Sequence, residues 1–286
     1  MFAFARSLLR PTTFPELVSE YYASQAFRSL SPSSQTPYRG VIDRLARDIG
    51  DRSLRSLSRR DMECVLAQRS PGAANDTLKK LRILARFAME RGYRRDDPTF
   101  GIRRFPAGEG HHTWNEAEIA QFEGHWPVGT RERLAFGLLI FTGQRRSDVV
   151  RMAWSDLAAN GNALVVTQRK TATKLIIPVH TQLATILAAV ERRAGAILQT
   201  PFGKAFTAGG FGNWMADRIE SAGLSERCVA HGLRKAAARR LAECGATTRE
   251  IAAITGHRTL REIERYTEAA SQERLAGQAM ARLERP

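Results

Sequence analysis

Apolar residues recur at helical spacing through the first hundred residues of this chain. Between residues 74 and 91, one face of a predicted helix carries Leu78, Leu81, Leu84, Ala85 and Ala88, and basic side chains occupy its other faces. Similar patterns predict three or four short amphipathic helices, over Phe14 to Phe27, Gln35 to Ile49, Ser58 to Arg69 and Gly72 to Arg91. We therefore expect a helical region with a core of its own and a basic surface.

The remainder of the chain combines helical patterns with one short β-hairpin. An apolar helical run over residues 134–141 is interrupted from Thr142 to Asp148, and a second run starts at Val149, which places Arg145 at a helix junction. Further on, two β-branched runs, residues 163–167 and 175–179, flank a turn from Gln168 to Lys174. These patterns predict a mainly α protein with a small β-sheet.

A break in the pattern separates the two regions. Residues 106–113 contain a proline and two glycines and belong to neither apolar periodicity, which is typical of a linker. A length of 286 residues and a hydrophobic content of 43% are sufficient for two domain cores.

The histidine and cysteine pattern predicts neither a metal site nor a disulfide framework. His111 and His112 are adjacent in the linker, and adjacent histidines without carboxylate or cysteine partners are usually loop residues. Cys64, Cys228 and Cys244 are scattered and odd in number, which fits free thiols in a reducing cytoplasm. We assign no metal and no cofactor.

The charge of the chain favours a polyanionic partner. There are 44 Lys and Arg residues against 29 Asp and Glu, a net charge of +15, and the pI is near 10.7. Residues 1–107 have 20 basic and 11 acidic side chains, a net charge of +9, and the rest of the chain has a net charge of +6. Both regions are therefore suited to hold phosphate. On the predicted helix from Gly72, the candidate phosphate contacts are Lys79, Lys80, Arg82 and Arg86; the alternative is a solvated basic face.

Six basic or phenolic residues in the second half carry the candidate chemistry. His231 and Arg234 are three residues apart and lie on one helix face, so that both can reach one ligand. A Gly-His pair follows at residues 256 and 257, and a tyrosine comes nine residues after that histidine. In chain order the residues are Arg145, Lys170, His231, Arg234, His257 and Tyr266.

This order resembles the tyrosine recombinase family, also called phage-type integrases, and the resemblance extends from about Thr12 to Ala269. It implies a two-domain DNA clamp: residues 1–105 as a helical core-type DNA-binding domain, 106–113 as a linker, 114–270 as the catalytic domain and 271–286 as a helical tail. The implied partners are double-stranded DNA, further copies of the chain in a tetramer on that DNA, and an accessory DNA-bending or directionality protein. The implied role is integration or excision of a mobile element, and chromosome-dimer resolution is the alternative.

The chemistry of a phosphodiester explains these residue types. The resemblance makes Tyr266 the nucleophile, which forms a 3′-phosphotyrosine and frees a 5′-hydroxyl, so neither metal nor ATP is needed. Arg145 and Arg234 supply fixed positive forks for the non-bridging oxygens. A phenol with a pKa near ~10 needs a base, and His231 is the candidate. Lys170 on the hairpin would protonate the leaving 5′-oxygen, with Lys174 as the fallback.

The resemblance also implies that His257 donates a hydrogen bond to the scissile phosphate. Each residue taken singly has a structural alternative, because a lone histidine is usually a structural hydrogen-bonding residue and a hairpin lysine often only marks a turn. The chain departs from the family pattern at Gly232, Asp148 and Thr255, where an acid, glutamate and leucine are commoner. Two other classes remain open, a type IB topoisomerase and a DNA-binding regulator that does not cut.

The two ends of the chain give weaker signals. Arg6 and Arg10 leave the N-terminal apolar segment too short for a signal peptide, and no apolar run reaches the ~20 residues that span a bilayer, so we expect a cytoplasmic, nucleoid-associated protein and no membrane partner. About a dozen residues precede the first helix, which predicts no separate arm-binding domain. The tail carries an apolar stripe at Leu275, Ala279 and Leu283 that resemblance predicts to dock on a neighbouring protomer; packing on its own domain is the alternative.

Overall fold

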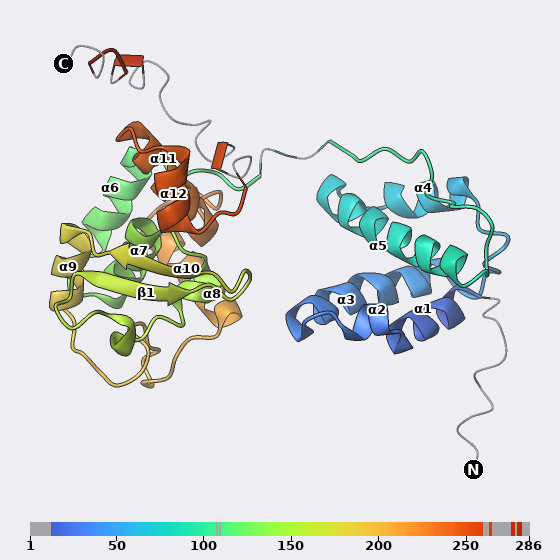
Figure 1. Ribbon diagram of the computed structural model, residues 1–286, viewed down its shortest axis with the longest axis horizontal. Helices are drawn as coiled ribbons and strands as arrows, with labels where there is room; N and C mark the ends of the chain where they lie inside the picture. Colours follow the sequence, from blue (N-terminus) through green and yellow to red (C-terminus); the bar gives the residue numbers. More distant parts are fainter. Residues whose placement is uncertain are drawn as a thin grey trace. The chain divides into compact units, whose positions relative to one another are not determined.

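The computed structural model describes residues 13–106, 108, 110–259, 263–264, 276–277 and 279–281. The chain forms two compact units, Met1–Gly110 and His111–Pro286, and each has its own hydrophobic core (Figure 1). Tyr266 and most of the tail over 271–286 lie outside the described residues, so what the sequence predicts for them stays a prediction. Among the described residues, no helix has the length and apolar character needed to cross a membrane.

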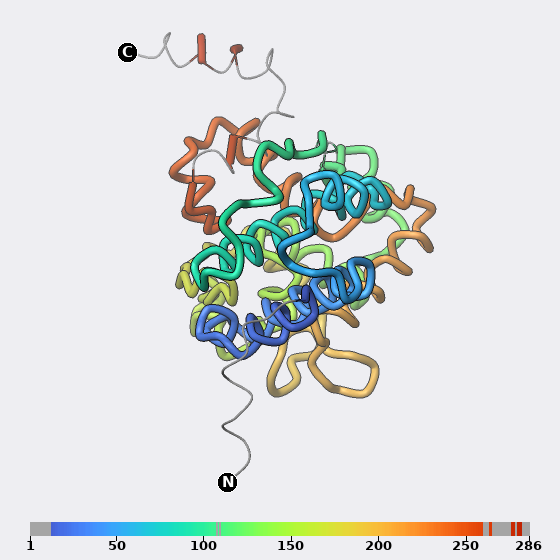
Figure 2. The backbone as a smooth tube through the Cα atoms, turned by 90° about the vertical axis from the view of Figure 1, so that its right-hand side faces the viewer, coloured from blue at the N-terminus to red at the C-terminus, as the bar shows by residue number. Residues whose placement is uncertain are grey.

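The N-terminal unit is a bundle of helices. Its helices are α1 (Phe14–Ala23), α2 (Gln25–Arg28), α3 (Pro32–Ile49), α4 (Arg59–Ala67) and α5 (Pro71–Glu90). Helices α1, α3 and α5 pack against one another, and α4 packs on α3 and α5 (Figures 1 and 2). The predicted apolar stripe of α5 is confirmed, because Leu78, Leu81, Leu84 and Ala88 are all buried in this bundle.

The helix boundaries differ from the sequence prediction where capping residues intervene. The single helix predicted over residues 14–27 is divided at Ser24, which takes an extended backbone conformation and caps α2 by accepting a hydrogen bond from the Phe27 amide. The next helix begins at Pro32 rather than at Gln35, since a proline in the first turn has no amide hydrogen to leave unpaired. Both differences depend on local cap chemistry, which apolar periodicity does not report.

The C-terminal unit surrounds one almost wholly buried helix with further helices and a hairpin. Its elements are α6 (Glu116–His125), α7 (Arg131–Thr142), α8 (Arg146–Val149), η2 (Trp154–Asp156), β1 (Ala163–Thr167), β2 (Lys174–Pro178), α9 (Thr181–Ala188), α10 (Ala208–Ser221), α11 (Ala230–Glu243) and α12 (Thr248–Thr255).

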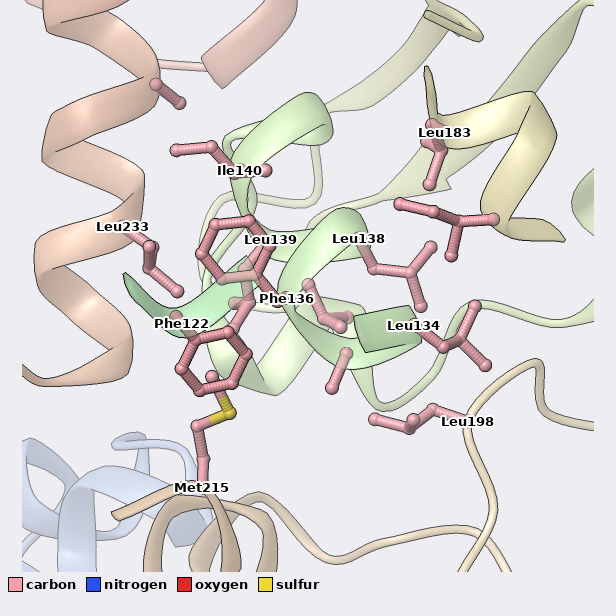
Figure 3. Packing of buried hydrophobic residues seen from close by; sticks show 14 of the residues in the cluster. Phe122, Leu134, Phe136, Leu138, Leu139, Ile140, Leu183, Leu198, Met215 and Leu233 are labelled. Carbon is pink, nitrogen blue, oxygen red and sulfur yellow. The ribbon is translucent and has the colours of Figure 1, made fainter. Parts of the chain in front are cut away.

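Helix α7 is the centre of this unit. Its apolar side chains point to several sides of the helix, as Figure 3 shows for Leu134, Leu138 and Leu139, and the helix packs against α8, α9 and α11. Gly137 allows the close approach of α9, because a β-carbon there would lie 2.8 Å from Cδ1 of Ile186. A buried central helix of this kind fixes the positions of the elements at its C-terminal end.

The two strands form an antiparallel hairpin. Ala163 pairs with Pro178 and Thr167 with Lys174, which places the second strand one residue earlier than predicted. Leu164, Val166 and Ile177 face the core, whereas Ile176 is 68% exposed. The turn between the strands carries Lys170, and Ala172 in that turn takes a positive φ of 54°.

Candidate active site

The junction after α7 positions the first predicted site residue. Helix α7 ends at Thr142 and is capped by Gly143, whose φ of 60° is in the left-handed region that glycine adopts without strain. Arg145 follows as the residue before α8, with an extended backbone and a half-buried side chain. The arginine predicted to lie at a helix junction therefore does so.

Arg234 is buried in the first turns of α11, with 1% of its surface exposed. Its Nη1 donates to the carbonyl oxygens of Gly143, at 2.5 Å, and Thr255, at 2.8 Å. Its Nη2 lies 2.7 Å from Nε2 of His257. The Arg234 guanidinium thus joins the C-terminal ends of α7 and α12 to α11. An arginine can bond to all three partners because its planar guanidinium carries several N–H donors in a fixed arrangement.

His257 is held in one tautomer by the hydroxyl of Thr255. That hydroxyl donates its single proton to the Ile251 carbonyl oxygen at 2.7 Å, so towards Nδ1 of His257, also 2.7 Å away, it acts as acceptor. The proton of the neutral ring is therefore on Nδ1, and Nε2 accepts from Arg234. Burial, followed by the positive charges of Arg234 and Arg145, lowers the pKa of His257 to about 3.

His231 lies beside this group in the first turn of α11. Its half-buried ring makes an edge contact with the ring of His111, at a centroid distance of 5.0 Å. Burial, followed by the charges of His111, Arg234 and Arg145 in that order, lowers its pKa to about 4. At neutral pH the imidazole is consequently uncharged, as a proton acceptor has to be.

A cavity of about 550 Å³ opens onto three of the predicted site residues. Arg145, His231 and Arg234 line it together with Gln144, Arg146 and Ser147. Its charged lining groups are basic, and the pKa of each histidine responds to both arginines. The structure therefore brings Arg145, His231 and Arg234 together at one positively charged hollow that suits an anion, and His257 joins the group through its contact with Arg234.

The turn that carries Lys170 is held beside this hollow by Gln168, which contacts two of the residues that line it. Lys170 itself is exposed, but the Gln168 side chain is fully buried, and its Oε1 lies 3.4 Å from Nη1 of Arg145. Its Nε2 donates to Oε1 of Gln144 at 2.7 Å and to the Thr255 carbonyl at 2.8 Å. The hairpin and the C-terminal ends of α7 and α12 therefore share one buried polar joint.

This joint explains two features of the sequence. Gly256 has a φ of 70°, and a β-carbon there would lie 2.4 Å from Nε2 of Gln168, so the glycine before His257 leaves room for the amide. The buried Asp148 accepts a hydrogen bond from the Arg169 amide at 2.9 Å and so holds the backbone next to Lys170. Lys174, the fallback lysine, is an exposed residue at the start of β2.

Sequence reasoning missed Gln144 and Gln168. Both are 0% exposed although their side chains are polar, and no apolar periodicity marks such positions. A weak signal existed at Gln144, which stands between a glycine that ends a helix and a candidate site arginine. At Thr255, which departs from the family pattern, the hydroxyl supplies the contact to His257 that a leucine would lack.

Gly232, a second departure, is explained by packing. A β-carbon at this position would lie 2.4 Å from the carbonyl oxygen of His112 and 2.7 Å from Cδ1 of Trp114. The segment that precedes α6 therefore lies directly against α11, and an acidic side chain would displace it. The Trp114 indole also donates to the Val229 carbonyl at 3.1 Å, on the same side of α11.

The adjacent histidines lie outside the helices and strands, as predicted, but they do have partners. The backbone carbonyl of His111 accepts from Nζ of Lys235 at 2.7 Å, and its ring contacts His231. Nε2 of His112 lies 2.8 Å from both carboxylate oxygens of Glu118. The premise that His112 lacks a carboxylate partner is wrong. Glu118 is six residues further along the chain, in the first turn of α6, and its carboxylate reaches the His112 ring.

The basic residues of the N-terminal unit divide into two groups. Lys79, Arg82 and Arg86 are on one face of α5 and, with Arg104, line a hollow of about 450 Å³. Lys80 is only 4% exposed, forms an ion pair with Asp76 and lies 4.7 Å from the centre of the Tyr38 ring. The prediction that Lys80 belongs to the exposed basic face is therefore wrong, since a step of one residue turns it towards the core.

Comparison with known structures identifies the fold. A lambda integrase dimer bound to a COC′ core site matches with a TM-score of 0.79 and 19% identity, over 91% of this chain and 97% of that one. The Tn1549 transposon integrase in complex with a circular intermediate DNA matches with a TM-score of 0.80 and 15% identity, over 95% and 100% of the two chains. The predicted fold, mainly α with a small sheet as in these integrases, is confirmed.

Comparison of the sequences identifies the family. Residues 115–273 match the model of the phage integrase family, and the chain belongs to that family. It is 30% identical over 163 residues to tyrosine recombinase XerC 2 of Ralstonia nicotianae, covering 53% of this chain and 46% of that protein. It is 29% identical over 157 residues to the integrase of Escherichia phage HK022, covering 53% and 43%. The chain thus spans less than half the length of these two relatives.

Proposed function

We propose that this protein is a tyrosine-type site-specific DNA recombinase. The observation that carries the proposal is the convergence of Arg145, His231 and Arg234 on one basic hollow, with His257 in contact with Arg234 and with the hairpin of Lys170 anchored at Arg145 through Gln168. These residue types match the needs of phosphoryl transfer from DNA to a phenol, which are fixed positive charges, a neutral base and a proton donor. Family membership supports the same conclusion.

In the proposed cleavage step, the oxygen of Tyr266 attacks the scissile phosphorus. The phenol proton passes to His231, the new bond to phosphorus forms, and the bond to the 5′-oxygen breaks. Lys170 protonates this leaving oxygen, so a free 5′-hydroxyl and a 3′-phosphotyrosine result. Ligation is the reverse reaction with the 5′-hydroxyl of a partner strand.

DNA itself completes the electrostatics of the proposed site. Without DNA, the pKa values of His231 and His257 are about 4 and about 3 because both rings are buried near arginines. A phosphodiester in the hollow adds negative charge, which raises both pKa values and makes His231 a stronger base. The phosphate also replaces His257 as an acceptor for Arg234, and a protonated His257 then donates from Nε2 to it.

Double-stranded DNA and further copies of this chain are the proposed partners. The net charge of +15 and the basic face formed by Lys79, Arg82 and Arg86 support binding of a polyanion. A lambda integrase tetramer bound to a Holliday junction matches this chain with a TM-score of 0.75 and 20% identity, over 88% of this chain and 79% of that one. We extend its assembly on DNA to this protein as part of the proposal; an accessory protein remains a prediction.

The proposed biological role is integration or excision of a mobile element, and chromosome-dimer resolution is the second candidate. Tyrosine recombinase XerD of Lacticaseibacillus casei favours the latter: it is 26% identical over 224 residues, covering 73% of this chain and 76% of that protein. The phage HK022 integrase favours the former at 29% identity. Genomic context of the DNA that the protein selects would separate the two roles.

A covalent trap on randomised DNA tests the proposal and selects the target sequence in the same experiment. The purified protein is incubated with a pool of nicked suicide duplexes of randomised sequence, and covalent adducts are isolated on denaturing gels and sequenced. We expect adducts that share a sequence and are absent with Tyr266→Phe. DNA binding without any adduct would favour a regulator that does not cut, and relaxation of supercoils without joining of two sites would favour a topoisomerase.

A further inference from the structure

Three side chains of different chemistry meet where the start of the C-terminal unit packs on α11. His112 precedes α6, Glu118 lies in the first turn of α6, and Cys228 comes just before α11. One imidazole nitrogen, one carboxylate oxygen and the thiol sulfur all lie within 4.8 Å of one another. Cys228 is 3% exposed, and the His112 and Glu118 side chains are 23% and 20% exposed, so the group is largely buried but reached by solvent at the imidazole and the carboxylate.

The donor set and its spacing suit a zinc ion. Imidazole, thiolate and carboxylate are the three groups that zinc takes in proteins, at bond lengths that place tetrahedral ligands roughly 3.3–3.7 Å apart. Nε2 of His112 and the Glu118 oxygens, now 2.8 Å apart, would have to separate slightly to reach this spacing, and the sulfur already lies within 4.8 Å of both groups. Because the His112 and Glu118 side chains are still reached by solvent, water is the expected fourth ligand.

Glu118 is held in a way that leaves one oxygen for a metal. Its Oε2 accepts from the Asn115 amide at 2.8 Å in the capping box that begins α6. That bond can persist while Oε1 turns to the ion, so metal binding does not require the helix end to open. The segment of His112 is fixed as well, because its carbonyl oxygen is packed against Gly232 of α11.

Metal binding at this group would compete with protonation of the Cys228 thiol. Burial, and then the negative charge of Glu118, raises the pKa of the Cys228 thiol to about 12, so the sulfur is protonated. Zinc would displace the thiol proton into solvent and stabilise the thiolate, and the neutral His112 ring would carry its proton on Nδ1 so that Nε2 is free to bind the ion. Cys64 and Cys244 are exposed and offer matched thiols outside the group.

The geometry points to a zinc site formed by His112, Glu118 and Cys228, with water as the fourth ligand. The ion would join the segment before α6 to the segment before α11, three residues ahead of His231. His111, next to His112, contacts the His231 ring, so an ion at this site would also fix the surroundings of the proposed base. The site itself does not depend on the recombinase proposal.

Cobalt(II) serves as a spectroscopic probe for the site. The reduced, chelator-treated full chain is titrated with Co²⁺, and absorption is followed for the thiolate-to-cobalt charge-transfer band and the visible bands of tetrahedral cobalt. We expect both bands to saturate at one equivalent and to disappear when Zn²⁺ is added. We also expect a hundredfold excess of Zn²⁺ over its Kd to raise Tm by about 5 °C.

Single substitutions decide whether the named residues hold the ion. Cys228→Ser should abolish the charge-transfer band and the shift in Tm, while Cys64→Ser and Cys244→Ser should retain both. Glu118→Gln keeps the side-chain shape and should weaken binding at least tenfold, whereas His125→Gln, a histidine outside the group, should not change it. A charge-transfer band that survives Cys228→Ser, or no band in the parent protein, would overturn the inference. Neither measurement involves DNA, so their outcome is separate from that of the suicide-duplex experiment.

Discussion

At the scale of single residues, the candidate site is defined by hydrogen-bond direction as much as by proximity. The Thr255 hydroxyl gives its proton to Ile251 and therefore accepts from His257, which then accepts from Arg234. Thr255 is in this sense a positioning residue: it fixes which nitrogen of the ring faces the guanidinium. A side chain without a hydroxyl leaves the ring free to rotate or to change tautomer.

The first prediction concerns this hydroxyl. Thr255→Val removes the acceptor for Nδ1 of His257 at nearly constant volume, and we expect the cleavage rate on suicide duplexes to fall about tenfold. Thr255→Ser retains the hydroxyl and should restore most of the rate. Nitrogen NMR of the histidine ring should show the Nδ1-protonated tautomer in the parent and in the serine variant only. A valine variant with an unchanged tautomer would contradict the assigned direction of the bond.

The second prediction concerns acid stability. The pKa values of His231 and His257 are lowered from 6.5 to about 4 and about 3, so between these values and 6.5 the unfolded chain binds more protons than the folded one. The free energy of unfolding should therefore fall as the pH drops from 6.5 towards 4. Urea titrations of the parent and of a His231→Gln, His257→Gln variant check this, because the double variant should lose much of that slope. His125→Gln, which leaves both buried rings in place, is the control.

At the scale of elements, sequence periodicity predicts the helices and strands that form by burying an apolar face. The stripe on α5 and the hairpin strands were predictable because apolar side chains at fixed spacing have to be buried together. The division at Ser24 was not, since one cap hydrogen bond decides it. Lys80 was placed wrongly because its basic side chain suggested a surface position, whereas Asp76 and Tyr38 accommodate it in a buried one.

In the candidate site too, some residues could be predicted from the sequence and others could not. Arg145, His231 and Arg234 at the hollow, and His257 beside Arg234, could be named from their order in the chain. Gln144 and Gln168 could not, because nothing in the sequence marks a glutamine as buried. Their partners include main-chain and side-chain groups from segments more than 20 residues away. Such bonds exist only once α7, α12 and the hairpin have packed.

The third prediction tests this joint. Gly256→Ala places a β-carbon 2.4 Å from Nε2 of Gln168 at a φ of 70°, so it combines backbone strain with a clash. Gly161→Ala, at a φ of 72° and with open space around it, supplies the strain alone, about 1 kcal/mol. We expect Gly256→Ala to cost about 2–4 kcal/mol in urea unfolding. Gln168→Ala in the same chain should recover part of the difference, and strict additivity of the two changes would exclude the clash.

At the scale of the whole molecule, positive charge is present in both units, so DNA binding should depend on both and on salt. The net charge of +15 predicts a steep loss of affinity as salt concentration rises. Where that charge lies matters more than its total, because buried cations with local partners release no counterions. Lys79 and Lys80 are neighbours in sequence that differ in this respect.

The fourth prediction uses this pair. Lys79→Ala removes a charge from the basic face of α5, so we expect weaker DNA binding and a salt slope reduced by about 0.9. Lys80→Ala removes a buried side chain that is paired with Asp76, so we expect lower stability and an unchanged salt slope. Fluorescence anisotropy across a salt series and thermal unfolding separate the two effects. Equal salt slopes for both variants would show that α5 does not contact phosphate through Lys79.

The amide of Gln168 has a consequence for building chimeric proteins from this one. It contacts Arg145, Gln144 and the backbone of Thr255, so three segments far apart in the chain meet at one side chain. A hairpin transplanted from a relative would bring that relative's residue to position 168. The residues that face it, Gln144 and Gly256, would still be those of this chain. We expect such grafts to retain the fold but misplace the lysine unless Gln144, Gln168 and Gly256 are exchanged as a set.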